Sequence, residues 1–235
     1  MRSFMGRLLT ASLYVIVTFA FCGSAYAADA STANPISAGT RILALGTSLI
    51  VLILIATAVT KGRPMRFLIG VDNRYSNSQC QLALWFGAVA TVYLATVLLR
   101  WRYLGSGFIG GVGITQNLLA MTGLSAFSFG GAKVITAQKV ANAPMPKPVA
   151  GSPNLLTDLI QNDFGNADLG DFQMILVTIA AVVIFVTTSF YFIGTADFAK
   201  AVTTLPDIDT TLLSGFGVGQ GAYLIKKAAL KPGEG

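Results

Sequence analysis

The stretch 42–60, ILALGTSLIVLILIATAVT, is nineteen residues long and carries no charged side chain. About 20 apolar residues in a helix cross the roughly 30 Å hydrocarbon core of a bilayer, so this stretch predicts a transmembrane helix. Lys61, Arg63 and Arg66 follow it directly. Because basic residues gather on the cytoplasmic side of membrane proteins, this cluster predicts that the helix ends in the cytoplasm.

The whole chain has the same character. Of its 235 residues, 54% are hydrophobic and 11% are charged, whereas a soluble domain carries about 25% charged residues. Four further apolar runs predict spans at about 80–99, 114–135, 172–193 and 208–225. The last run is the shortest, and a re-entrant or interfacial segment is its alternative. The net charge of +6 is divided among the segments between spans, so we expect a lipid bilayer and no nucleic acid as a partner.

The N-terminus has the pattern of an export signal. Arg2 and Arg7 precede a short apolar run, and an Ala-Tyr-Ala motif ends at Ala27. These features predict a cleaved signal peptide over 1–27 and a periplasmic arm over 28–41. The alternative is an uncleaved first transmembrane helix.

The basic residues orient the spans. With a cleaved signal and five spans, ten Lys and Arg residues fall inside and four outside; if the last run did not cross, seven would fall on each side. The positive-inside rule therefore favours five spans, with a periplasmic mature N-terminus and a cytoplasmic C-terminus. The expected location is a bacterial inner membrane.

A cytoplasmic linker separates the third and fourth predicted spans. It covers 140–171 and opens with a proline-rich segment, which predicts an extended chain. A short helix is expected after it, with Leu155, Leu156, Leu159 and Ile160 on one face. Both a position on the membrane surface and packing against the protein's own bundle fit this pattern.

A weak internal repeat organises the remaining helices. Segment 117–133 matches 211–227 at an offset of 94, with Leu118/Leu212, Leu119/Leu213, Gly123/Gly217 and Lys133/Lys227 identical. The preceding spans align as well, and Asp168 is predicted to cap the start of the fourth.

We therefore predict an all-α integral membrane protein with five transmembrane helices, in which a lone helix precedes two similar hairpins in a parallel repeat. Residues 42–139 hold the first helix and first hairpin, 172–227 the second hairpin, and 228–235 a cytoplasmic tail.

The hairpins are rich in glycines that allow helix backbones to approach closely in lipid. These predicted packing or oligomer residues are Gly123, Gly130, Gly131, Gly215, Gly217, Gly219 and Gly221. Packing within one subunit and packing around an oligomer axis remain equal alternatives.

Candidate chemical groups are few. The chain has no His, and no Asp, Glu, Lys or Arg lies near the middle of a predicted span. We expect no catalytic set, cofactor or metal site. Gln116 and Asn117 are candidates for a pore mouth or a helix cap. Arg74 is a candidate lipid-phosphate contact or a cytoplasmic charge at a helix start.

These observations favour a non-enzymatic scaffold or accessory subunit, packed through its Gly-rich helices with itself or with other membrane subunits. A passive homo-oligomeric channel is the alternative.

Overall fold

A computed structural model of the chain describes residues 36–70, 72–142, 149–161 and 166–229. The predicted signal peptide lies outside the described residues. Most of the predicted arm, of the tail and of the proline-rich part of the linker also lies outside them.

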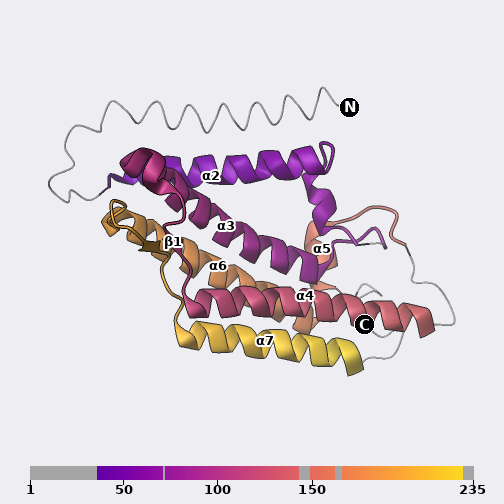
Figure 1. The fold of residues 1–235 in the computed structure, drawn as a ribbon. Helices are drawn as coiled ribbons and strands as arrows, with labels where there is room; N and C mark the ends of the chain where they lie inside the picture. The colour runs from indigo at the N-terminus through magenta and orange to yellow at the C-terminus, as the bar shows by residue number, and fades with distance from the viewer. Residues whose placement is uncertain (1–35, 71, 143–148, 162–165, 230–235) are drawn as a thin grey trace. The chain divides into compact units, whose positions relative to one another are not determined.

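The described part of the chain is mostly helical (Figure 1). Its elements, with 3₁₀ helices written η, are α2 (Ala38–Val59), η2 (Pro64–Leu68), α3 (Asn77–Leu104), η3 (Gly105–Phe108), β1 (Val112–Gly113), α4 (Gln116–Asn142), α5 (Leu155–Ile160), α6 (Leu169–Thr195), β2 (Thr203–Thr204) and α7 (Thr210–Ala229). Each predicted span coincides with a long helix to within about five residues at either end, except that α4 continues seven residues past the predicted end at 135; α5 lies where the short linker helix is expected.

Four helices in the described residues are long and apolar enough to cross a membrane: α2, α3 with η3, α4 and α6. Large apolar side chains such as Ile42 on α2 and Leu176 on α6 are exposed, as contact with lipid requires. The predictions of a helical fold and of transmembrane helices are confirmed at this level. Helix α7 has 20 residues but is not among these four, so the fifth span stays a prediction.

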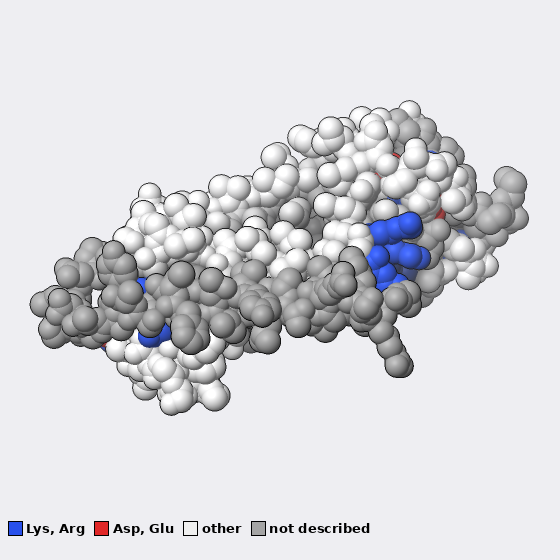
Figure 2. All heavy atoms as spheres, turned by 90° about the horizontal axis from the view of Figure 1, so that it is seen from above, with Lys and Arg blue, Asp and Glu red and all other residues white. Residues whose placement is uncertain are grey.

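A sharp turn and a basic segment follow α2. Lys61 and Gly62 have φ values of 56° and 90°, and the Gly62 N–H donates to the Thr57 carbonyl at 2.8 Å. This left-handed turn satisfies a carbonyl at the helix end and stops the helix. The exposed side chains of Lys61, Arg63 and Arg66 follow. Figure 2 shows one larger and one smaller group of Lys and Arg side chains among the described atoms of this view.

The chain divides into two units, and α3 and α6 contribute residues to both. The first unit holds α2, α3 from Gly87 onward, both short strands, and α6 from Ile184 onward. Its buried core comprises Ala44, Ala95, Leu99, Ile193 and Phe198. Strands β1 and β2 pair in parallel, with Val112 opposite Thr203.

A buried arginine holds in place the loop between α6 and β2, residues 196–202. Arg100 is 1% exposed, and its guanidinium donates to the Lys200 carbonyl at 2.8 Å, the Ala201 carbonyl at 3.0 Å and the Thr203 hydroxyl at 2.9 Å. Gly111 makes room for it, because a Cβ at that position would overlap the guanidinium. Arg100 is one of the four basic residues that the sequence analysis counts on the outer side of the membrane, and its side chain is buried within this unit.

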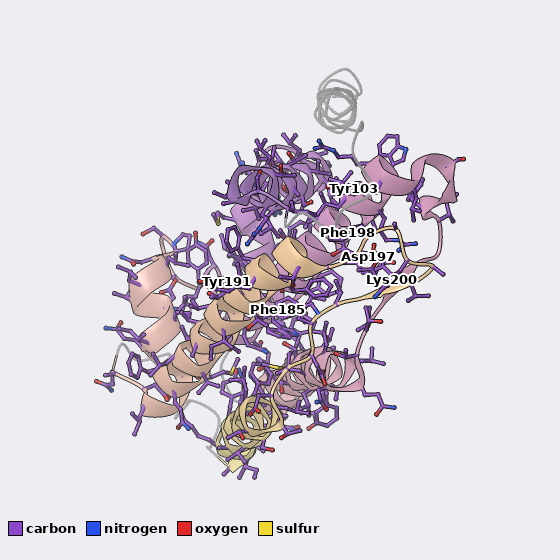
Figure 3. The ribbon with its side chains drawn as sticks, turned by 90° about the vertical axis from the view of Figure 1, so that its left-hand side faces the viewer. Tyr103, Phe185, Tyr191, Asp197, Phe198 and Lys200 are labelled. Atoms are coloured by element: carbon purple, nitrogen blue, oxygen red, sulfur yellow. The ribbon has the colours of Figure 1, made fainter. Side chains whose placement is uncertain are left out.

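An aromatic pair covers the same loop. Tyr103 and Phe198 stack with ring centroids 6.1 Å apart, beside Asp197 and Lys200 (Figure 3). The loop before β2 is thus held by both polar and apolar contacts.

The second unit holds the first part of α3, the first part of α6, and all of α4, α5 and α7. Helices α4 and α7 pack side by side (Figure 1). A Cβ on Gly131 would lie 3.3 Å from Leu224, and one on Gly217 would lie 3.5 Å from Leu124. Both contacts join residues 93 positions apart, so α4 and α7 run in the same direction.

Candidate functional site: a charged helix end and a buried polar layer

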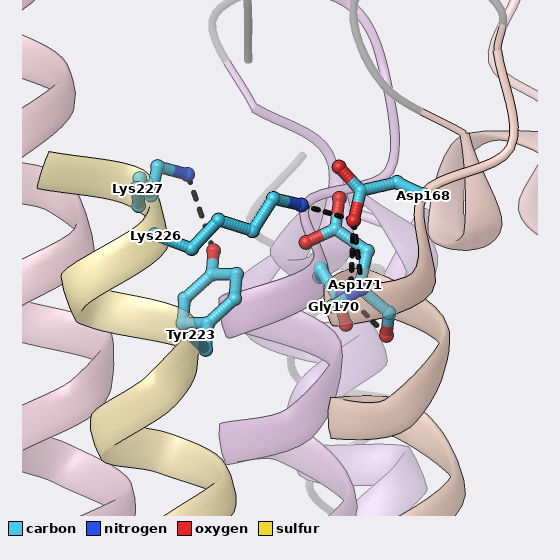
Figure 4. Close-up of polar contacts among 7 residues, drawn as sticks. Asp168, Gly170, Asp171, Tyr223, Lys226 and Lys227 are labelled. Atoms are coloured by element: carbon cyan, nitrogen blue, oxygen red, sulfur yellow. Dashed lines mark hydrogen bonds and ion pairs between the residues drawn. The ribbon is translucent and has the colours of Figure 1, made fainter. Parts of the chain in front are cut away.

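The first α6 turn and the last α7 turn form a charged cluster in the second unit (Figure 4). The Asp168 carboxylate accepts hydrogen bonds from the backbone N–H groups of Gly170 at 2.9 Å and Asp171 at 3.1 Å, which is the predicted capping role. It also forms an ion pair with Lys226. Lys227 donates to the Tyr223 hydroxyl at 3.1 Å.

The electrostatics of this cluster favour an ionised carboxylate. Desolvation by burial on its own raises the pKa of Asp168, but the hydrogen bond from Lys226, the two backbone N–H bonds and the lysine charge together hold the pKa below its ordinary value. Asp168 is therefore a charged clamp between α6 and α7 rather than a proton donor at neutral pH.

The start of α3 contacts the charged cluster at the start of α6. The Asn77 side-chain amide donates to the Asp171 carbonyl at 2.9 Å. The later part of the linker also docks here, since Asn73 donates to the Ala150 carbonyl at 2.9 Å and the Asp158 carboxylate accepts from the Tyr75 N–H at 3.0 Å. The end of the predicted linker is thus packed on its own bundle, while Leu156 of α5 remains 77% exposed.

A layer of buried polar side chains lies further inside the second unit. We define the polar layer as Gln81 of α3, Ser125 and Ser128 of α4, Thr178 of α6 and Gln220 of α7; all are buried. The Gln81 amide donates to the Ser125 hydroxyl. Thr178 donates to its own helix, at the Met174 carbonyl.

The helix registers bring these residues to one level. Trp85 donates to the Thr122 hydroxyl at 3.1 Å, and its ring lies 6.0 Å from that of Phe216. One helical turn from this aromatic pair, toward the charged end, α3 presents Gln81 and α7 presents Gln220.

The other two helices reach the same level. The offset of 93 between α4 and α7 places Ser125 and Ser128 on either side of Gln220. Met174 packs in one cluster with Tyr223, which brings Thr178, one turn deeper, to this level as well.

Three oxygens of the polar layer have no hydrogen-bond partner among the described residues: Gln81 Oε1, Ser128 Oγ and Gln220 Oε1. Buried polar groups are nearly always paired, and an unpaired one is costly in a low-dielectric interior. The layer therefore has spare capacity to accept hydrogen bonds or to hold a cation.

The structure divides the predicted packing glycines into three groups. Gly131 and Gly217 lie at the α4–α7 contact. Exposed Gly123 and Gly215, and half-buried Gly130 and Gly221, have no neighbouring atom within 4 Å of a built Cβ. Gly219 is buried, and a Cβ there would also meet nothing within 4 Å.

The remaining predicted site residues lie in different surroundings. The Asn117 side chain donates to the Ile208 carbonyl at 3.1 Å and so ties the α4 start to the segment before α7, whereas Gln116 is exposed. Arg74 is half-buried, and its Nε has no hydrogen-bond partner among the described residues. The lipid-phosphate contact of Arg74 stays a prediction.

The polar layer was not predicted, because the expected signal of a functional group inside a span was a charged residue and the layer is neutral. The available signal was the pair of amide side chains, Gln81 and Gln220, inside otherwise apolar runs. The class that the fold defines is an α-helical membrane protein, and its apolar helices are compatible with a membrane location. No family model, curated protein or solved structure matches the chain.

Proposed function

We propose that this chain is a non-enzymatic component of a bacterial inner membrane, and that it assembles with itself or with other membrane subunits through the outer faces of α4 and α7. The observation that carries the proposal is the exposure of Gly123 and Gly215. Each leaves a Cβ-sized space unoccupied, whereas Gly131 and Gly217 are already used within the chain.

Small residues continue along both outer faces. On α4, Ala126 is exposed and Gly130 half-buried, three and seven residues after Gly123; on α7, Ala222 is exposed seven residues after Gly215. These spacings keep the residues on one side of each helix. In lipid, such faces allow another helix to approach closely and gain van der Waals contact.

The proposed arrangement has five spans in a parallel repeat. The matching directions of α4 and α7 support the repeat, as does the parallel pairing of β1 with β2, 91 residues apart. The exposed basic segment after α2, together with Lys226 and Lys227 at the end of α7, supports a cytoplasmic C-terminus. A cysteine introduced at Ala229 in a Cys22→Ser, Cys80→Ala background tests this. It should resist membrane-impermeant thiol reagents in intact cells and react after lysis.

Native mass spectrometry of gently extracted protein tests the assembly. We expect a species of fixed stoichiometry, either a homo-oligomer or a complex with foreign subunits. Gly123→Leu and Gly215→Leu should dissociate it, because the new side chains would occupy the outer faces. Gly46→Leu on α2, where a Cβ also meets nothing within 4 Å, is the matched control and should leave the assembly intact. A wild-type monomer would contradict the proposal.

The second candidate is a passive pore formed by a homo-oligomer, and the exposed position of Gln116 at the α4 start favours it. Gln116→Lys should then change ion flux in liposomes, because a charge at the mouth of a pore alters its selectivity. Asn117→Lys is less informative, since it also removes the hydrogen bond to Ile208. Unchanged flux in Gln116→Lys would exclude the pore.

A further inference from the structure

The unpaired groups of the polar layer are oxygens. Gln81 Oε1, Ser128 Oγ and Gln220 Oε1 come from three different helices of the second unit and are buried. Amide oxygens accept hydrogen bonds or coordinate cations but cannot donate. The Ser128 hydroxyl can both accept and donate, so the two amide oxygens restrict the ligand: one that satisfies them must carry positive charge or donor hydrogens.

The charge of the layer restricts the ligand further. All five side chains of the layer are neutral. Of the two carboxylates at the charged end, Asp168 is already paired with Lys226, and Asp171 lies about two helical turns before Thr178 along α6. Divalent Ca²⁺ and Mg²⁺ are bound mainly through carboxylates. Neutral oxygens in a low-dielectric interior suit a monovalent cation, as do the carbonyl oxygens of membrane ion sites.

The polar layer has open space beside Gln220 and aromatic residues one helical turn away on either side. Gly219, next to Gln220, is buried and leaves room for at least a methyl group. The rings of Trp85 and Phe216 lie one turn to one side, and buried Tyr223 lies one turn to the other.

We propose that the polar layer is a binding site for a dehydrated monovalent cation, coordinated by the side-chain oxygens of Gln81, Gln220 and Ser128. The site lies about 9 Å from the level of Lys226, six residues along α7 at about 1.5 Å per residue. It is independent of the outer faces of α4 and α7, so it does not rest on the proposed assembly.

The test is thermal unfolding of the purified full chain in nanodiscs at constant ionic strength. Na⁺, K⁺ and NH₄⁺ are each compared with N-methyl-D-glucamine, which is too large for the site. At roughly ten times its dissociation constant, a bound cation should raise the midpoint by about 3–6 °C. The three arms identify the ion.

Variants test whether the cation-dependent rise in the unfolding midpoint arises at the polar layer. Gln220→Met and Ser128→Ala should abolish or weaken the cation-dependent shift; Ser128→Ala removes only a hydroxyl and is the safer variant for folding. Gln138→Met, at an exposed position of α4, should keep the shift. The proposal is overturned if no cation raises the wild-type midpoint above the N-methyl-D-glucamine value, as expected if buried water alone satisfies the oxygens. It is equally overturned if the shift survives in both layer variants.

Discussion

Lys226, in the last turn of α7, forms an ion pair with Asp168, the residue that caps the start of α6. The Asp168 side chain is 10% exposed and that of Lys226 is 33% exposed. One carboxylate thus satisfies two backbone donors of one helix and the charge of another. The ion pair therefore links the start of α6 to the end of α7 in the second unit.

Removing the lysine should destabilise this end. Lys226→Met leaves the Asp168 carboxylate largely buried without its charged partner, and we expect a loss of about 1 kcal/mol in the free energy of unfolding, because partial solvent exposure weakens the pair. Lys227→Met, which removes a hydrogen bond to the Tyr223 hydroxyl and a cation–π contact with the Tyr223 ring, should cost less. Thermal unfolding of both variants measures the difference, and equal losses would contradict a specific role for the ion pair.

The same pair predicts a pH dependence. The pKa of Asp168 is lower in the folded state than its ordinary value of 3.8. Its contribution is therefore fully present above that ordinary value and is lost as the pH falls through the lower, folded pKa. Unfolding midpoints of wild type and Asp168→Asn, measured from pH 7 down to pH 2.5, should converge at the acid end. Asparagine still caps a helix, so a constant gap at all pH values would show that the carboxylate charge contributes nothing.

Arg100 should be essential to the loop before β2. Arg100→Met leaves the carbonyls of Lys200 and Ala201 without their donor inside the first unit, and we expect a loss of about 3 kcal/mol. Limited proteolysis should then cut within 197–204 faster than in wild type. Arg102→Met, two residues along the same helix, is the comparison. If both variants resist proteolysis equally, the buried contacts do not hold the loop.

The glycines of α4 should separate into two classes. Gly131→Val inserts a side chain against Leu224, already 3.3 Å from a built Cβ, and overpacking of this kind costs about 1–3 kcal/mol. Gly123→Leu should leave the stability of the isolated chain nearly unchanged, because its position is open and exposed. Thermal unfolding in detergent distinguishes them. Equal destabilisation would show that the two glycines occupy similar surroundings.

Much of the helical fold could be predicted, because its signals are local. The run 42–60 predicts α2 from hydropathy alone, and Asp168 predicts a helix start because capping depends on residues next to it. The glycine pattern predicts close packing but cannot separate Gly131, which contacts α7, from Gly123, which faces outward. That difference depends on how α4 is rotated against its neighbour.

The sequence by itself determined the membrane class of this protein and the positions of its long helices, because burial of about 20 apolar residues in lipid depends on composition along one segment. Only the tertiary structure decided that Arg100 is buried among loop carbonyls and that Gln81 and Gln220 reach one level. Those facts depend on helix register and on contacts between residues over a hundred positions apart in the chain, which no local pattern encodes.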